Sequence, residues 1–399
     1  MTKKILFLIG SLNAGGAERS LVSLLALLPQ DKYQIDLMLI KQEGDFLKSV
    51  PDYINIVNAP LPFRYLGVSP KNLKIFLKYG IKWWFVKIFN HIGTLILVKK
   101  RKLSYSQALW TMWRRYIAPN EISYDVAVSY LEGVTNYYII DCVNATHKFL
   151  WIHNEYNKLH YDSEFDSFYF AQSDSVVTIS NTCKQDLEKY FPSLRDKIVK
   201  IENITNPGYV KSKAVESINE IEYPEDKNCL KILSVGRLVP QKSYDLAIQS
   251  ACELKKMGIS FHWLILGEGE ERNVLQQMID ENGLNQYIQL VGVKKNPYPY
   301  IANCDVVVQT SIFEGKSIVI DEAKILCKPI VITNYVTATD AIINNINGII
   351  VEREPYEVAN AIVRVSKDDQ LKNRLVAYLF ENEENNLSEI NKYMSLFDL

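Results

Sequence analysis

Short runs of consecutive apolar residues recur along this chain and alternate with segments in which apolar residues repeat every three or four positions. Residues 4–9 form such a run, a glycine-rich segment follows at 10–16, and residues 17–28 have the helical spacing. Runs that are apolar throughout are typical of parallel strands covered on both faces. The same pattern predicts further strands at residues 35–40, 54–57, 124–131, 148–152, 175–179 and 197–201.

The alternation weakens after residue 210 and begins again at residue 229. Residues 211–228 are rich in Lys, Glu, Ser and Asn, as expected of a linker. Beyond them the pattern predicts strands at residues 230–235, 261–266, 288–291, 305–310 and 329–333, and helices at residues 245–256, 271–281, 317–326 and 355–366.

Two successive βαβ series predict an α/β fold of two facing Rossmann-like domains, each a doubly wound parallel sheet. A chain of 399 residues suits two such domains, which we expect at residues 1–210 and 229–380. Residues 381–399 are predicted to form a C-terminal helix that packs back on the first domain. Ligands of these sheets bind beyond the carboxyl ends of the strands, so the cleft between the domains is the expected site.

The net charge of −1 conceals an uneven distribution. Residues 53–120 contain no Asp or Glu but twelve Lys and Arg, which leaves −13 on the rest of the chain. This block includes an insertion expected at about residues 62–118, and it carries Trp83, Trp84 and the cluster Lys99, Lys100, Arg101 and Lys102. Basic helices with aromatic residues on one face suit an anionic membrane surface, where each cation contributes about 1 kcal/mol.

The basic block is also compatible with two different roles. Nucleic acid is a polyanion too, but no RNA- or DNA-binding motif accompanies the patch, so no nucleic-acid partner is expected. Alternatively, the insertion packs its apolar face on its own domain and its lysines are simply solvated.

The remaining composition narrows the class of protein. Six scattered cysteines, none in a C-x-x-C pair, indicate buried core residues in a reducing compartment. The first apolar run is too short for a signal peptide, and no stretch approaches the roughly 18 apolar residues of a membrane span. The five histidines lack zinc-type spacing and no D-x-D triplet occurs, so no metal is expected. We therefore expect a cytoplasmic protein, attached peripherally to the inner face of the cytoplasmic membrane.

Gly15 and Gly16 stand between the first predicted strand and its helix. Adjacent glycines let a ligand approach the backbone, and the free amides at a helix start attract anions. The segment is not G-x-G-x-x-G, and Lys41 and Gln42 follow the second strand where a nicotinamide cofactor would need an acidic residue. A nicotinamide site is therefore disfavoured, and a tight structural turn is an equal alternative to an anion site.

The second predicted domain holds more specific patterns. Arg237 and Lys242 both follow its first strand. There the forked guanidinium of an Arg and the single charge of a Lys can converge on a diphosphate. The alternative is that both are solvated cations of a loop. Glu314 and Glu322 are eight residues apart, the first in a loop and the second on a helix. Eight helical steps bring the second carboxylate back to within about 80° of the first, so both are expected to face one cleft.

The motifs occur in the order and spacing of a known family. The chain resembles the retaining glycosyltransferases of family four, which have the GT-B fold and are marked by Glu-x7-Glu. The matching segments are the Gly-Gly-Ala-Glu-Arg loop and residues 151–153, 179–181, 203–207, 236–242, 266–269, 291–292, 296–298 and 314–322. Only residues 53–120 and the C-terminal tail lie outside the resemblance.

The resemblance implies a role for each matching residue. Glu322 would bind the ribose hydroxyls of the nucleotide, and Glu314 would hold the donor sugar beside the reacting carbon. Arg237 and Lys242 would stabilise the departing diphosphate. His153 would contact the donor sugar from the first domain, although without the resemblance a core histidine is the favoured interpretation. Further donor contacts are implied for Gly236, Gly315, Lys316, Ser317, Ile318, Val291, Gly292 and Tyr298, and contacts with phosphates or acceptor for Gly15 and Gly16.

The resemblance thus implies a metal-independent enzyme without a cofactor that transfers a sugar with retention from a nucleotide-sugar co-substrate. Uridine is the expected base, ahead of guanosine. A glycan or lipid-linked acceptor in the synthesis of capsule, exopolysaccharide or another cell-surface polysaccharide is expected. Lys316 replaces an aromatic or small residue common in the family, which leaves the donor sugar open. A non-catalytic GT-B scaffold subunit and a nucleotide-sugar epimerase are the alternatives, and the oligomeric state does not follow from the sequence.

Overall fold

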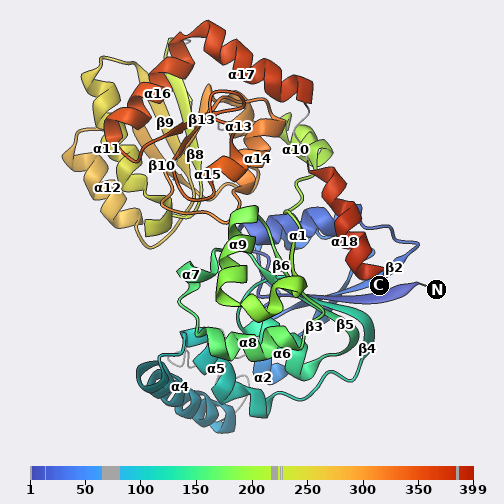
Figure 1. The fold of residues 1–399 in the computed structure, drawn as a ribbon. Coiled ribbons are helices and arrows are strands. Elements are labelled where there is room, and N and C mark those ends of the chain that lie inside the picture. The colour runs from blue at the N-terminus through green and yellow to red at the C-terminus, as the bar shows by residue number, and fades with distance from the viewer. Residues whose placement is uncertain are drawn as a thin grey trace. The chain divides into compact units, whose positions relative to one another are not determined.

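The chain forms two compact units in the computed structural model (Figure 1). Unit 1 contains Met1–Ile204 and Ser388–Leu399, and unit 2 contains Thr205–Leu387. The residues that the structure describes are 2–13, 15–64, 81–216, 223–224, 226, 228–382 and 386–399. Residues 65–80 of the predicted insertion and residues 217–222, 225 and 227 of the predicted linker lie outside them.

A seven-stranded parallel sheet forms the centre of unit 1, in the order β3-β2-β1-β4-β5-β6-β7. Ile5 of β1 lies beside Ile35 of β2 and Val126 of β4. Every residue from Ile5 to Ile9 is buried, which requires cover on both faces and confirms the interpretation of the apolar runs. The strands are β1 (Lys3–Ile9), β2 (Tyr33–Leu39), β3 (Asn55–Asn58), β4 (Ser123–Ser129), β5 (Asn144–Ile152), β6 (Ser175–Thr178) and β7 (Ile198–Lys200).

Polar side chains set the starts of several helices in unit 1. Ser104 and Gln107 form a capping box, in which Ser104 Oγ accepts from the Gln107 amide at 3.2 Å and Gln107 Oε1 accepts from the Ser104 amide at 3.1 Å. The helices are α1 (Gly16–Leu27), α2 (Leu61–Arg64), α4 (Ile81–Arg101), α5 (Tyr105–Trp113), α6 (Val134–Cys142), α7 (Tyr156–Leu159), α8 (Ser163–Ala171), α9 (Asn181–Tyr190) and α18 (Ile390–Phe397), with short 3-10 turns at Asp45–Ser49, Arg114–Tyr116 and Pro192–Lys197.

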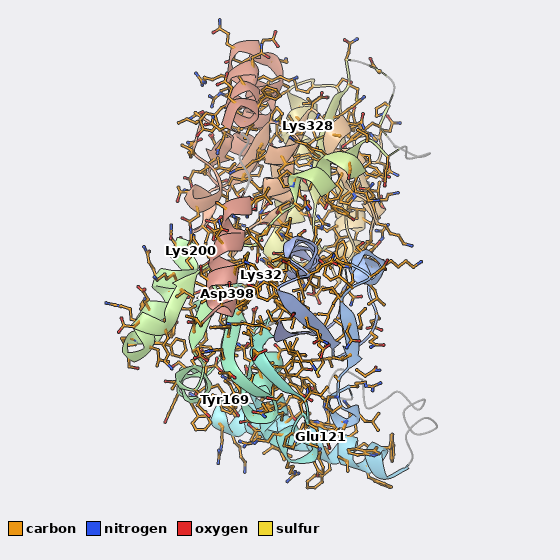
Figure 2. All side chains as sticks on the ribbon, turned by 90° about the vertical axis from the view of Figure 1, so that its right-hand side faces the viewer. Lys32, Glu121, Tyr169, Lys200, Lys328 and Asp398 are labelled. Atoms are coloured by element: carbon orange, nitrogen blue, oxygen red, sulfur yellow. The ribbon has the colours of Figure 1, made fainter. Side chains whose placement is uncertain are left out.

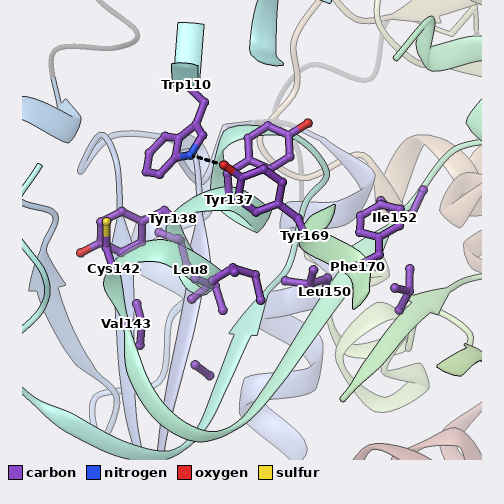
Figure 3. Close-up of a cluster of buried hydrophobic side chains, with 14 of the residues drawn as sticks. Leu8, Trp110, Tyr137, Tyr138, Cys142, Val143, Leu150, Ile152, Tyr169 and Phe170 are labelled. Atoms are coloured by element: carbon purple, nitrogen blue, oxygen red, sulfur yellow. Dashed lines mark hydrogen bonds between the residues drawn. The ribbon is translucent and has the colours of Figure 1, made fainter. Parts of the chain in front are cut away.

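Aromatic side chains fill the core on one face of this sheet (Figure 3). Trp110 of α5 is fully buried, and its Nε1 donates to Tyr169 Oη at 3.1 Å and to Asp141 Oδ2 at 2.9 Å. Trp113 is buried in the same cluster. Two tryptophans of the basic block therefore serve the core of unit 1, because their segment packs against α6 and α8.

One buried carboxylate, that of Asp166 on α8, connects four helices. Its Oδ1 accepts from Tyr137 Oη of α6 at 2.7 Å and from Gln107 Nε2 of α5 at 3.0 Å, and its Oδ2 accepts from Tyr156 Oη of α7 at 2.7 Å. Burial raises the pKa of Asp166 to about 6, although the three donors lower it. This carboxylate joins the helices that cover one face of the sheet.

The C-terminal helix α18 belongs to unit 1. The Phe397 ring packs edge-on against Phe7 of β1, with ring centroids 5.7 Å apart. Tyr33 Oη donates to Asp398 Oδ1 at 2.9 Å, and Figure 2 labels Asp398 at the end of this helix. Lys3 Nζ donates to the carbonyl oxygens of Phe397 and Leu399. The last residues of the chain are therefore fixed to its first strand.

Unit 2 contains a six-stranded parallel sheet in the order β10-β9-β8-β11-β12-β13. Its strands are β8 (Leu230–Val235), β9 (Phe261–Leu266), β10 (Ile288–Gly292), β11 (Val306–Gln309), β12 (Ile330–Thr333) and β13 (Ile349–Val351). The pattern missed β13, whose three residues are too few to show periodicity. The order 3-2-1-4-5-6 recurs in both units, and it is the strand order of a Rossmann fold.

The chain enters unit 2 through a helix that the pattern did not predict. Asn206 caps α10, and Pro207 occupies its first position, where a missing amide costs nothing. The helices are α10 (Pro207–Ala214), α11 (Tyr244–Lys256), α12 (Arg272–Glu281), α13 (Tyr298–Asn303), α14 (Ile318–Ile325), α15 (Ala338–Ala341), α16 (Pro355–Lys367) and α17 (Asp369–Asn382), with 3-10 turns at Pro240–Lys242 and Leu387–Glu389. Residues 211–214 are therefore helical, although the sequence suggested a linker there.

Candidate functional site

The carboxyl ends of β8 and β11 lie next to each other in unit 2, at the point where the strand order changes direction. Folds of this kind bind their ligands at such a switch point. Gly236 and Arg237 follow β8, Lys242 ends the next 3-10 turn, and Glu314 lies in the loop after β11. The topology therefore carries both predicted cations and one predicted carboxylate to the same edge of the sheet.

Lys242 and Glu314 form an ion pair, with 2.5 Å between Nζ and Oε1. Both side chains are largely buried, at 15% and 8% exposed, and Ser311 Oγ also donates to Oε1 of Glu314 at 2.6 Å. Since a partly desolvated cation and carboxylate interact far more strongly than an exposed pair, each holds the other in place. The pair is the one direct contact between predicted catalytic side chains in the described part of unit 2.

Backbone and side-chain hydrogen bonds fix the two loops that carry this pair. The Ile312 amide donates to the carbonyl of Gln241 at 2.8 Å, and Gln241 Nε2 donates to the carbonyl of Phe313 at 2.9 Å. Thr337 Oγ1, from the loop after β12, donates to the carbonyl of Glu314 at 2.7 Å. These hydrogen bonds hold the two loops, and therefore the ion pair, in a fixed position, as a binding site requires.

Two buried phenols adjoin the Glu314 carboxylate. Burial, reinforced by the charge of Glu314, raises the pKa of Tyr244 and of Tyr335. Both phenols therefore stay protonated at neutral pH, and the Tyr335 hydroxyl has no hydrogen-bond partner among the described residues. A Cβ on Gly236 would lie 2.8 Å from Tyr244 Oη, so glycine at 236 makes room for this phenol beside the loop.

Arg237 and Glu322 differ in how they are placed. Arg237 is exposed and makes no hydrogen bond or ion pair with the described residues, so its guanidinium is available to an anionic ligand. Glu322 lies on α14, as its spacing from Glu314 predicts, but none of its surface is exposed. A ribose can therefore reach this carboxylate only after neighbouring residues move.

The loop between the two glutamates has an ordered interior. Gly315, Ser317 and Ile318 are buried, and Ser317 Oγ donates to Gln309 Oε1 at 2.7 Å at the start of α14. Lys316 Nζ lies 3.5 Å from Asp321 Oδ2, and both side chains are mostly buried. Lys316, which departs from the family pattern, is therefore neutralised by a carboxylate in the first turn of the helix that follows its loop.

Three glycines bring neighbouring loops of unit 2 into close contact. Gly267 follows β9, its amide donates to the carbonyl of Gly292 at 2.9 Å, and a Cβ on it would lie 1.8 Å from the carbonyl oxygen of Gly236. Gly292 itself has a φ of 75°, which favours glycine. Gly236 and Gly292 are thus neighbours through Gly267. Val291 is half-buried, and Tyr298 is buried at the start of α13.

In unit 1, His153 follows β5 and is 7% exposed. Burial lowers the pKa of its imidazole, although Glu132 and a polar contact with Asn203 counteract this, so the ring is neutral at pH 7. Glu132 accepts hydrogen bonds from the His153 amide at 3.0 Å and from Asn154 Nδ2 at 2.6 Å. The carboxylate therefore fixes the backbone that carries the imidazole.

The predicted glycine loop of unit 1 meets an acidic side chain. Gly15 is the N-cap of α1, and Gly16 is its first residue. A Cβ on Gly15 would lie 2.1 Å from a carboxylate oxygen of Glu18, which stands in the first turn of the helix. A carboxylate near a helix N-terminus is favourable, and it competes there with the anion that the sequence suggested.

The basic block presents a different surface from the one expected. Trp83 packs inward against Tyr116 and the core of unit 1, and Trp84 is half-buried, so neither is an exposed aromatic anchor. The exposed apolar side chains of α4 follow one helical stripe and are 48–67% exposed: Phe85, Phe89, Ile92, Leu95 and Ile96. Lys99, Lys100, Arg101 and Lys102 are exposed at the end of the same helix.

Several residues around these sites carry no sequence motif. Tyr335 and Thr337 come from the loop after β12, more than twenty positions from Glu314, and only the fold brings them there. Glu132 could have been found, because it directly follows the predicted strand of residues 124–131. Over the described ranges, no three His, Cys, Asp or Glu side chains are grouped as metal ligands, and no helix has the length and hydrophobicity of a membrane span.

Comparisons with known proteins agree with this architecture. Residues 216–381 match the family model of the glycosyl transferases group 1. A glycosyltransferase of unknown specificity from Methanocaldococcus jannaschii is 25% identical over 53% of this chain and 54% of its own length, so the chain spans about half of that relative. An N-acetylgalactosamine-N,N'-diacetylbacillosaminyl-diphospho-undecaprenol 4-alpha-N-acetylgalactosaminyltransferase of Campylobacter jejuni is 26% identical over 84% of this chain and 81% of its own length.

Among solved structures, Anabaena HepE in complex with UDP and glucose superposes with a TM-score of 0.70. The match is 16% identical and covers 98% of both chains, which establishes the fold alone. The two parallel sheets, the matching segment in unit 2 and these relatives agree with one another. The chain has the GT-B fold, and its residues 216–381 match the glycosyl transferases of group 1.

Proposed function

We propose that this protein transfers a sugar, with retention of anomeric configuration and without a metal, from a nucleoside-diphosphate donor to a glycan or lipid-linked acceptor of a cell-surface polysaccharide. The observation that carries the proposal is the buried Lys242–Glu314 ion pair at the switch point of unit 2. Arg237, which lies on the same loop as Lys242, carries an exposed guanidinium. Two cations beside one ordered carboxylate suit a diphosphate leaving group and a sugar with several hydroxyls.

Each residue in this proposal has a separate task. Arg237 and Lys242 neutralise the negative charge that grows on the diphosphate as the glycosidic bond breaks. Glu314 holds sugar hydroxyls through the oxygen that Ser311 does not occupy. His153, neutral because it is buried, offers a ring nitrogen to the donor sugar from unit 1. Glu322 receives the ribose once its surroundings open.

A uridine nucleotide is the proposed donor base. The Anabaena structure that shares this fold holds UDP and glucose, and the Campylobacter jejuni relative is named for a diphospho-undecaprenol acceptor. These observations favour UDP-sugars over GDP-sugars and support a lipid-linked acceptor for this chain.

A panel of UDP-, GDP- and ADP-sugars tested by thermal shift identifies the donor. Only a ligand that binds the native state raises the melting temperature, because binding adds RT ln(1 + [L]/Kd) to the free energy of unfolding. We expect a UDP-sugar to give the largest rise and to be hydrolysed slowly without acceptor. No hydrolysis with any donor would indicate a scaffold subunit, and an isomerised nucleotide sugar would indicate an epimerase.

Substitutions at Glu322 and Arg237 separate nucleotide binding from turnover. We expect Glu322→Ala to raise the Kd for UDP by about tenfold or more, because the ribose loses two hydrogen bonds to a charged acceptor. Arg237→Ala should instead lower kcat by about 100-fold with little change in the KM for the donor, because the charge that Arg237 neutralises develops as the glycosidic bond breaks. Calorimetric titration with UDP and initial-rate measurements check both. A Glu322→Ala variant that binds UDP normally would remove Glu322 from the site.

We also propose that α4 contacts an anionic membrane surface. Its exposed stripe of Phe85, Phe89, Ile92, Leu95 and Ile96 would lie among the lipid headgroups, with the cluster Lys99–Lys102 beside the phosphates. An uncovered apolar stripe on a helix that ends in four exposed cations is unfavourable in water and suits an anionic interface. This surface would bring the enzyme to its lipid-linked acceptor.

Sedimentation with vesicles of phosphatidylcholine and phosphatidylglycerol tests the membrane contact. Replacing all four residues of Lys99–Lys102 by Ser should abolish most binding at low salt, since screening removes the same attraction at high salt. Phe85→Ser with Phe89→Ser should weaken binding at every salt concentration. Phe380→Ser is the matched control, because Phe380 is 74% exposed on α17 of unit 2. Equal binding by all variants would exclude α4 as the contact.

A further inference from the structure

His153 lies at one end of a stack of buried aromatic rings that extends to the C-terminal helix. Its imidazole is 5.2 Å from the Tyr130 ring, Tyr130 stacks on Trp151 at 5.6 Å, and Trp151 stacks on Tyr393 of α18 at 5.7 Å, measured between ring centroids. All four side chains are buried. The stack therefore joins the carboxyl ends of β4 and β5 to a helix more than two hundred residues later.

Hydroxyl groups in the stack form a chain of hydrogen bonds with only one possible direction. Tyr393 Oη donates to the carbonyl oxygen of Glu202 at 3.2 Å, and this uses its single proton. Tyr130 Oη, 3.2 Å from Tyr393 Oη, must then donate to it, and Ser20 Oγ of α1, 3.0 Å away, must donate to Tyr130. Burial raises the pKa of Tyr130 to about 12, so the chain stays neutral and ordered.

This chain determines what surrounds the imidazole. No proton of Tyr130 is left for His153, and neither ring nitrogen has a hydrogen bond of standard geometry with the described residues. The orientation of the ring is therefore set by the groups that touch it, among them the Tyr130 ring and Asn203. Tyr393 acts on two of them, since it holds Tyr130 and also anchors Glu202, whose neighbour Asn203 contacts the imidazole.

We propose that Tyr130 and Tyr393 are positioning residues that orient His153 for sugar transfer, so that the C-terminal helix is a working part of unit 1. The proposal rests on the proposed function, in which His153 contacts the donor sugar. Misplacing a group in a binding site by about 1 Å can cost up to about 100-fold in rate. Removing one hydroxyl from the chain loosens the stack without emptying it.

The variants Tyr130→Phe and Tyr393→Phe test the proposal, with Tyr33→Phe as the matched control. Tyr33 also loses one hydroxyl that holds α18, through Asp398, but it lies outside the stack. We expect Tyr130→Phe and Tyr393→Phe to lower kcat about tenfold, with the KM for donor unchanged. They should also shift the imidazole resonances of His153, identified by their loss in His153→Gln. Tyr33→Phe should lower the Tm similarly but leave kcat and these resonances unchanged.

A second measurement separates orientation of His153 from general stability. In the His153→Gln background, Tyr130→Phe should have no further effect on kcat, because both act through the same ring. The proposal would be overturned if Tyr130→Phe and Tyr393→Phe lowered the Tm without lowering kcat. It would also be overturned if Tyr130→Phe lowered kcat by the same factor in the wild-type and His153→Gln backgrounds. Wild-type turnover by His153→Gln would instead remove His153 from the proposed function. Unchanged imidazole resonances of His153 in Tyr130→Phe would show independently that the tyrosines do not orient the ring.

Discussion

Replacement of Lys242 by methionine should lower kcat for sugar transfer by about 100- to 1000-fold, the size of effect expected when one preorganised group is removed from a developing negative charge. Methionine is unbranched like lysine and is shorter only by the terminal ammonium, so the change mainly removes the charged group. Glu314 would be left nearly buried with Ser311 as its remaining donor, which should also reduce the free energy of unfolding by about 3 kcal/mol. Initial rates and urea denaturation measure the two effects separately.

A matched control comes from the Lys256–Glu253 pair of the same unit, 2.8 Å apart with Lys256 at 70% exposed. Lys256→Met should leave kcat and stability unchanged, because solvent screens an exposed pair. Glu314→Gln should lower kcat as Lys242→Met does, and the double variant should lose less than the product of the two effects, since the pair acts as a unit. Wild-type kcat in a folded Lys242→Met variant would contradict the proposed role of the pair.

Replacement of Asp166 by alanine should destabilise unit 1 by about 3–5 kcal/mol. The substitution leaves the hydroxyls of Tyr137 and Tyr156 without their acceptor in the core, and Gln107 Nε2 keeps only its hydrogen bond to the carbonyl of Asp162. Glu164→Ala is the control, because Glu164 is exposed on the same helix. Urea denaturation followed by tryptophan fluorescence measures the difference. A loss as small as that of Glu164→Ala would show that the four helices do not depend on this carboxylate.

The pH dependence of this stability follows from the raised pKa of Asp166. The folded protein holds the proton up to about pH 6, whereas an unfolded Asp releases it near its ordinary pKa of 3.8. The stabilisation from the protonated form is therefore complete below about pH 4 and lost as the pH rises to 6. We expect wild type to lose at most about 3 kcal/mol relative to Asp166→Asn over this window. A difference that is constant with pH would contradict the assignment.

The central strands of this protein were predictable because they are buried on both faces. Residues 230–235 and 261–266 were predicted as strands, and β8 and β9 have those bounds. Helix ends were less predictable: α10 starts at Asn206 and Pro207 and continues to Ala214, inside the segment of residues 211–228 that was predicted as a linker. Capping depends on two or three side chains, whereas periodicity accumulates over a whole element, so the second signal is stronger.

The basic block shows where composition is insufficient. Its charge and tryptophan content indicated an aromatic surface, yet Trp110 and Trp113 are in the core and Trp83 packs inward. Phenylalanine and aliphatic residues of α4 are exposed instead. Which side of an insertion faces its own domain depends on the shape of the surface beneath it, and that surface is assembled from α6 and α8, distant in sequence.

The sequence by itself determined two Rossmann-like parallel sheets, the family pattern, and the loops that carry Arg237, Lys242 and Glu314, because these follow from local periodicity and strand ends. Only the tertiary structure decided which side chains meet: the Lys242–Glu314 pair, the burial of Glu322 and the stack from His153 to Tyr393. Such contacts join segments up to hundreds of residues apart. Their geometry is set by how helices pack on the sheets, which no local pattern encodes.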